Sequence, residues 1–130
     1  MYVLDSCASG LALKRGDIDS NALRQVKAYE DIKYYAQNGR MILTAGSQGE
    51  AAIDVNGGIF THAFIDGIRG SADREVGDNN GVVDFYELFA YVHREVTNEA
   101  SKRGFLQHPD FSTGGGMGRF FFITDRSLTK

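Results

Sequence analysis

Cysteine and proline are rare in this 130-residue chain, which holds one of each against 16 glycines. A single cysteine cannot form a disulfide within the chain, and a free thiol is typical of proteins in a reducing compartment. We therefore expect a cytoplasmic protein. The excess of glycine over proline indicates many turns with positive backbone φ angles and few rigid breaks.

A basic excess, a long apolar run and a signal peptide are also missing. The formal net charge of -3 offers no basic surface for nucleic acid. No apolar stretch is long enough to cross a membrane, and the apolar start is too short and lacks the basic flank of a secretory signal. No repeat or composition shift divides the chain. We expect one soluble domain with neither a nucleic-acid nor a membrane partner.

Helical and extended patterns alternate along the chain. Periodic apolar residues predict helices over residues 20–38, 58–68 and 84–102, and short apolar runs predict strands over residues 2–4, 41–44 and 120–123. The inward residues of the last helix are expected to be Phe85, Leu88, Val92 and Val96. The last strand is continuously apolar, which is typical of a strand covered on both faces. Strands that alternate with helices favour an α/β fold.

The only cysteine follows the first predicted strand directly. Residues 5–10 read DSCASG, so Cys7 lies in a turn of small residues. A turn at a strand end presents both the sulfur and the cysteine's own N–H to a cleft, as a thiol nucleophile that attacks an amide carbonyl requires. The alternative is a buried structural cysteine, which is common beside strands.

This hexapeptide resembles the catalytic-cysteine motif of caspase-like cysteine peptidases, in particular the metacaspases and their bacterial relatives. Further segments follow in the order of that family: TAG at residues 44–46, GIFT at 58–61, RG at 69–70, an Asp/Asn/Gly loop, and QHP at 107–109. The resemblance implies that residues 1–130 are a partial caspase-like peptidase domain, its C-terminal half. It also implies the α/β/α sandwich of the family, with a mainly parallel central sheet.

The resemblance implies a role for two residues of the hexapeptide. Cys7 would form a thioester with the carbonyl of a peptide or protein substrate, and Asp5 would receive the Arg or Lys side chain before the cleaved bond. A carboxylate pairs with a guanidinium through two charge-assisted hydrogen bonds. The alternative is that Asp5 only caps the turn through backbone N–H groups. Metacaspases often place a second acidic residue after the next strand, where this chain offers only Glu50, slightly displaced.

The family's catalytic base, a histidine upstream of the cysteine, has no counterpart here. His62, His93 and His108 all follow Cys7. The first two fall on predicted helices, where a packed or surface role is expected, and His108 falls in a segment that lies near the substrate cleft of the family. We therefore expect a separate N-terminal caspase-like half, carrying the histidine, as a partner. The alternative is a non-catalytic half-domain that binds peptides or another protein.

The loop over residues 73–87 has two interpretations. Several of its residues match an EF-hand calcium loop at positions three, five, six, nine and twelve: Asp78, Asn80, Gly81, Asp84 and Glu87. Val76 stands at the first ligand position, and Asp73 could replace it only if the loop bulged. The simpler alternative is a capping box between Asp84 and Glu87 at the start of the long helix. We therefore predict no metal and no cofactor.

A self-processing site is expected in the polar stretch after the cysteine. Caspase-like enzymes are often matured by cuts in this linker, and here it carries Lys14 and Arg15. An exposed loop adopts the extended conformation that a peptidase cleft requires more readily than a helix does. We predict cleavage after Lys14 or Arg15.

Overall fold

The computed structural model describes residues 2–4, 39–54, 57–114 and 118–124. The helix predicted over residues 20–38 lies outside these ranges. The described elements, in chain order, are β1 (Tyr2–Leu4), β2 (Arg40–Thr44), α3 (Ile59–Asp66), the π-helical η1 (Gly67–Ser71), α4 (Ala72–Glu75), β3 (Val82–Asp84), α5 (Phe85–Lys102), β4 (Asp110–Gly114) and β5 (Phe121–Ile123).

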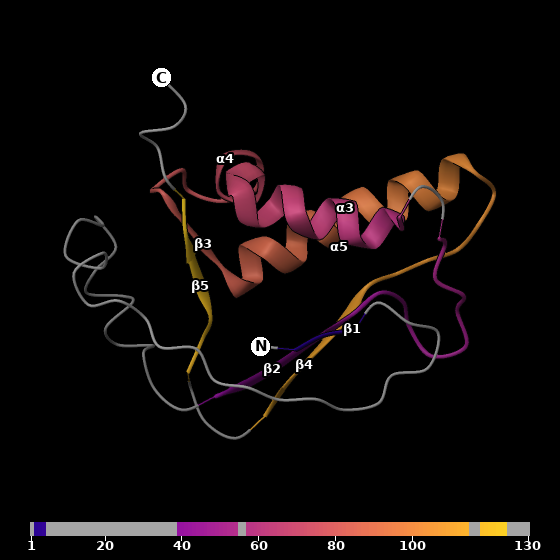
Figure 1. Cartoon of the computed structure of the whole chain (residues 1–130), viewed down its shortest axis with the longest axis horizontal. Coiled ribbons are helices and arrows are strands. Elements are labelled where there is room, and N and C mark those ends of the chain that lie inside the picture. Colours follow the sequence, from indigo (N-terminus) through magenta and orange to yellow (C-terminus); the bar gives the residue numbers. More distant parts are fainter. Residues whose placement is uncertain (1, 5–38, 55–56, 115–117, 125–130) are drawn as a thin grey trace.

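Two small sheets are formed by the described strands. The first has the order β1-β2-β4, in which β1 runs parallel to β2, and β4 runs antiparallel to β2. Its register pairs Leu4 with Thr44, and Thr44 with Asp110. The second sheet is the antiparallel pair β3 and β5. The helices lie together on one side of the β1-β2-β4 sheet (Figure 1).

The predicted α/β/α sandwich with a mainly parallel central sheet is wrong for the described residues. Two of their three strand pairings are antiparallel. The reason is visible in Figure 1: α3 and α5 run in opposite directions, so the chain leaves the carboxyl end of β2 and returns to that same end before it enters β4. A parallel pair would need a crossover that returns the chain to the opposite end.

The last strand also differs from its prediction. β5 was expected to be covered on both faces, but it pairs only with β3 among the described strands, and the Ile123 side chain is 41% exposed. A strand in a two-stranded sheet needs less apolar cover than a central strand of a larger sheet. The continuous apolar run therefore indicated a strand but not its burial.

The core lies between β2 and the helices. Met41 and Leu43 alternate with less buried residues along β2, so one face of this strand enters the core. On α5, the four residues predicted to face inward are all buried: Phe85, Leu88, Val92 and Val96. Among the described residues no helix combines the length and the hydropathy needed to span a membrane.

Glycine allows the close approach of η1 to α5. A Cβ added at Gly67 would lie 2.7 Å from Cδ1 of Leu88 and 3.2 Å from Cδ1 of Tyr91. Gly70 then takes a φ of 110°, a conformation that side chains with a Cβ rarely adopt. Together these glycines redirect the chain from α3 into α4, which carries Asp73 to the start of the loop before β3.

Candidate functional site

The residues predicted to carry the chemistry lie outside the described residues. These are Cys7, Asp5 and the processing pair Lys14 and Arg15. The described structure does include the strand before them, because β1 ends at Leu4 beside Thr44, the last residue of β2. The loop that follows β2, residues 45–53, begins at this same end of the sheet.

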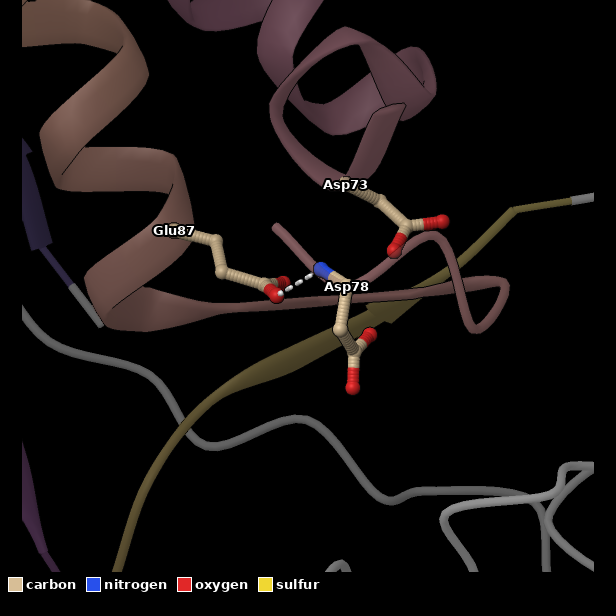
Figure 2. Close-up of side chains that lie close together, drawn as sticks. All are labelled: Asp73, Asp78 and Glu87. Atoms are coloured by element: carbon tan, nitrogen blue, oxygen red, sulfur yellow. Dashed lines mark hydrogen bonds between the residues drawn. The ribbon is translucent and has the colours of Figure 1, made fainter. Parts of the chain in front are cut away.

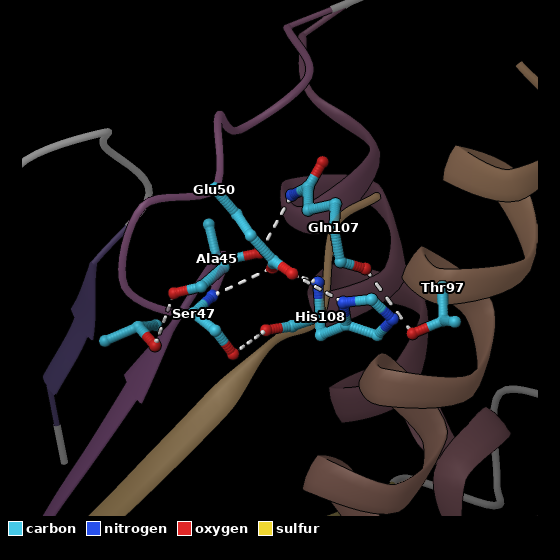
Figure 3. Close-up of polar contacts among 8 residues, drawn as sticks. Ala45, Ser47, Glu50, Thr97, Gln107 and His108 are labelled. Atoms are coloured by element: carbon cyan, nitrogen blue, oxygen red, sulfur yellow. Dashed lines mark hydrogen bonds and ion pairs between the residues drawn. The ribbon is translucent and has the colours of Figure 1, made fainter. Parts of the chain in front are cut away.

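A buried glutamine closes the loop over residues 45–53. Gln107 is only 1% exposed, and its Nε2 donates to the Ala45 carbonyl at 2.8 Å while its Oε1 accepts from the Ile53 N–H at 2.9 Å. Figure 3 shows this side chain reaching the loop from the segment before β4. Leaving a buried amide without hydrogen-bond partners is costly, so both contacts are maintained. Since one contact is to Ala45 and the other to Ile53, they hold the two ends of the loop at a fixed separation.

Glu50 and His108 connect the same two segments through hydrogen bonds. His108 Nδ1 lies 2.6 Å from Glu50 Oε1, and the backbone N–H groups of His108 and Ser47 donate to Glu50 Oε2 at 2.7 and 3.1 Å. Ser47 Oγ donates in return to the His108 carbonyl at 3.0 Å. We call these four residues, Ser47, Glu50, Gln107 and His108, the polar clamp (Figure 3).

The clamp changes the expected role of Glu50. The hydrogen bond from the His108 side chain, followed by the backbone hydrogen bonds, lowers the pKa of Glu50 despite some desolvation. The carboxylate is therefore ionised at neutral pH and already has three protein donors. Its geometry supports a role in holding the loop more directly than a role as a free acidic ligand for a substrate cation.

The three histidines lie in different surroundings. His62 is on α3 and exposed, and His93 is on α5 with its ring centroid 5.6 Å from that of Phe89, so the helical positions of both were predicted correctly. The ring of His108 is oriented by the Glu50 carboxylate, an arrangement that can hold a proton at a defined atom. The sequence did not indicate this pair, because 58 positions separate its members.

The second polar cluster is the acidic turn, residues 73–87. Asp73 is 1% exposed, and its two carboxylate oxygens accept from the Asn80 and Gly81 N–H groups, both at 2.9 Å. The predicted capping box is confirmed: Asp84 Oδ1 accepts from the Glu87 N–H at 2.8 Å, and Glu87 Oε2 accepts from the Asp84 N–H at 3.0 Å. The carboxylates of Asp73, Asp84 and Glu87 therefore all accept hydrogen bonds from backbone N–H groups.

Three carboxylates of the acidic turn also converge. Asp73, Asp78 and Glu87 each offer an oxygen within 4.8 Å of the others, as Figure 2 illustrates, and these oxygens could hold a cation. Desolvation is the main cause that raises the pKa of Glu87, and the charges of Asp84 and Asp73 add to it. Val76, at the first EF-hand position, supplies no ligand, whereas Asp73 does reach the turn, which the sequence had allowed only for a bulged loop.

Comparisons with protein-family models, with curated proteins and with solved structures found no match for this chain.

Proposed function

We propose that this chain is the nucleophile-bearing part of a caspase-like cysteine endopeptidase that cleaves after Arg or Lys. Cys7 attacks the peptide carbonyl and forms a thioester, and Asp5 binds the basic side chain before the cleaved bond. The catalytic histidine comes from outside these 130 residues, on an N-terminal caspase-like half. A free thiol nucleophile suits a reducing, cytoplasmic compartment.

The parallel pairing of β1 and β2 is the observation that supports this proposal most. The register joins Leu4 to Thr44, so the segment that leads to Cys7 begins at the same sheet end as the loop over residues 45–53. Cys7 is three residues beyond Leu4, and three residues span at most about 11 Å. Both segments therefore begin at the carboxyl ends of two neighbouring strands.

The polar clamp supplies the second line of support. A peptidase needs a rigid wall beside its nucleophile, because reacting groups must be held in a productive geometry. The clamp fixes the loop over residues 45–53 with a buried amide and a carboxylate–imidazole hydrogen bond. This loop begins where β2 ends, and β2 is the neighbour of the strand that precedes Cys7.

Turnover of peptide amides that end in Arg or Lys tests the proposal. The 130-residue chain alone should hydrolyse them negligibly, and an N-terminal half that carries the catalytic histidine should restore cleavage by about two to four orders of magnitude. Cys7→Ala should abolish the restored activity. In the Asp5→Ala variant, kcat/KM on Arg and Lys substrates should fall by roughly two orders of magnitude. The rate at which a small reagent alkylates Cys7 should change far less in this variant.

Two results would contradict the proposal in different ways. Robust turnover by the isolated chain would show that no external base is needed. Full activity of Asp5→Ala on Arg substrates would show that Asp5 is only a turn cap.

The alternative, a non-catalytic half-domain, predicts peptide binding without turnover even when the N-terminal half is present. The active enzyme should also cut itself after Lys14 or Arg15, whereas Cys7→Ala should keep its intact mass.

A further inference from the structure

The turn that ends α5 is the most exposed continuous stretch among the described residues. Residues 101–106 are all exposed, and Phe105 and Leu106 are 57% and 74% exposed although both are large apolar residues. The turn carries two adjacent basic residues, Lys102 and Arg103, followed by Gly104. No other part of the described chain combines these features.

Few contacts hold this turn closed. The N–H groups of Gly104 and Phe105 donate to the carbonyls of Ser101 and Ala100 at 3.0 Å, which is the pattern of a Schellman motif, and Gly104 takes the required positive φ of 75°. The Arg103 N–H also donates to the Ala100 carbonyl. These bonds lie at a helix end, where local opening is easiest. Lys102 Nζ donates to Glu99 Oε1 at 2.6 Å, whereas the Arg103 side chain reaches Glu99 only at 3.7 Å.

On both sides of the turn the chain is firmly anchored. Ala100 is fully buried within α5, and Gln107 is pinned by the polar clamp. Opening is therefore confined to residues 101–106, three on each side of the Arg103–Gly104 bond. A peptidase cleft takes up an extended segment of about this length.

The other described arginines are held more tightly. Arg40 lies in β2, Arg69 and Arg74 lie in η1 and α4, and Arg94 in α5 is bound to Glu75 and Glu95. Arg119 lies against the ring of Tyr86 at 4.7 Å.

We propose that the Arg103–Gly104 bond is a proteolytic processing site for a peptidase of Arg/Lys specificity. This inference rests on the proposed function, because that peptidase is a second copy of the assembled enzyme. Hydrolysis breaks the C–N bond, adds the hydroxyl of water to the Arg103 carbonyl carbon, and leaves an α-amino group on Gly104. The product is a nicked chain, since residues 104–130 contain β4 and β5, which pair with β2 and β3.

The cut has a structural consequence beside the candidate site. It removes the covalent link between α5 and the segment that carries Gln107 and His108. The clamp contacts to Ala45, Glu50 and Ile53 remain, as does the hydrogen bond from Thr97 Oγ1 on α5 to the Gln107 carbonyl, so the segment stays in place without its peptide link to α5. Residues 104–106 become a free end with two exposed apolar side chains.

The test uses the full chain with Cys7→Ala, which cannot cut itself, as the substrate. It is mixed with a small amount of active assembled enzyme or, separately, with dilute trypsin, and intact masses are followed over time. In both digests denaturing mass spectrometry should detect the fragment over residues 104–130, and native size-exclusion chromatography should show that it stays bound to the rest of the chain. A substrate that also carries Lys102→Gln and Arg103→Gln should be cut at this turn at least tenfold more slowly. The control substrate carries Arg74→Gln, at an exposed position on α4, and should be cut at this turn at the unchanged rate.

The trypsin arm separates the two possible failures. If trypsin cleaves other sites but spares residues 101–106, the turn is not a processing site and the inference is overturned. If trypsin cuts here but an enzyme that turns over Arg peptides does not, self-processing is overturned. If the assembled enzyme cleaves no Arg peptide at all, the proposed function fails, and self-processing fails with it even though the trypsin result still establishes the accessible bond.

Discussion

The polar clamp and the acidic turn both close a loop with carboxylates that accept backbone N–H groups, but they join very different stretches of chain. In the clamp, Gln107 and His108 bind partners 54 to 62 positions away. In the acidic turn, the carboxylate of Asp73 binds N–H groups seven and eight positions away. Hydrogen bonds between residues a few positions apart can be predicted from their spacing in the sequence. Hydrogen bonds between distant residues depend on how the whole chain folds.

The two regions also treat charge in opposite ways. Glu50 faces an imidazole that donates to it, and its pKa is lowered. Glu87 is partly desolvated among other carboxylates, and its pKa is raised. The clamp therefore stabilises the ionised form of its carboxylate, and the acidic turn stabilises the protonated form of Glu87. This difference predicts opposite responses to acid.

Removing the buried carboxylate of the acidic turn should have the largest effect. Asp73→Ala loses two charge-assisted hydrogen bonds and leaves the Asn80 and Gly81 N–H groups without this acceptor, which should reduce the free energy of unfolding by about 4 kcal/mol. Urea unfolding measures this loss. Asp78→Ala, at an exposed neighbour, should cost less than about 0.5 kcal/mol. Equal losses in the two variants would contradict the anchoring role of Asp73.

Breaking the clamp should cost somewhat less, because its amide is neutral. Gln107→Leu keeps the volume but leaves the Ala45 carbonyl and the Ile53 N–H unpaired, at a cost of about 3 kcal/mol. Gln48→Leu is the matched control, since Gln48 is exposed on the same loop. Hydrogen exchange at Ile53 should accelerate in the Gln107 variant only. Unchanged protection there would show that the amide does not hold the loop.

The capping box should contribute less again. Asp84→Ala removes the side-chain acceptor of the Glu87 N–H at the start of α5, and loss of an N-cap costs about 1 kcal/mol. Asp84→Asn, which keeps an acceptor oxygen, should recover most of the loss in thermal unfolding. If both variants destabilise the protein equally, the hydrogen bond is not the cause.

The smallest expected effects are the opposite pH responses of Glu50 and Glu87. The lowered pKa of Glu50 gives stability that is present above its unfolded-state value and is lost as pH falls through its folded pKa. The raised pKa of Glu87 gives stability that is present below its unfolded-state value and is lost as pH rises through its folded pKa.

Chemical unfolding from roughly pH 7 to pH 3 measures both responses. As the pH falls, the difference in the free energy of unfolding by which wild type exceeds Glu50→Gln should shrink. Over the same range the free energy of unfolding of wild type should rise relative to that of Glu87→Gln. Parallel curves for the two variants would contradict the assigned environments.

The same contrast explains how much of the structure the sequence predicted. The capping box, the buried face of α5 and the strand at residues 41–44 depend on spacing within a few turns of chain, and all three were predicted correctly. The strand β4 was not predicted at all, and neither was the antiparallel pairing of β4 and β5, because pairing depends on how α3 and α5 return the chain to the sheet. The Glu50–His108 pair was missed for the same reason.

Labelling of Cys7 shows whether its thiol is the nucleophile that cleaves after arginine. An arginine peptide with a thiol-reactive ketone at its carboxyl end is incubated with the chain plus an N-terminal half that carries the catalytic histidine, and the modified residue is identified by tandem mass spectrometry. We predict an adduct on Cys7 that appears in step with loss of turnover, and slow labelling by the matching aspartate peptide. Turnover lost with Cys7 unmodified, or equal labelling by both peptides, would contradict it.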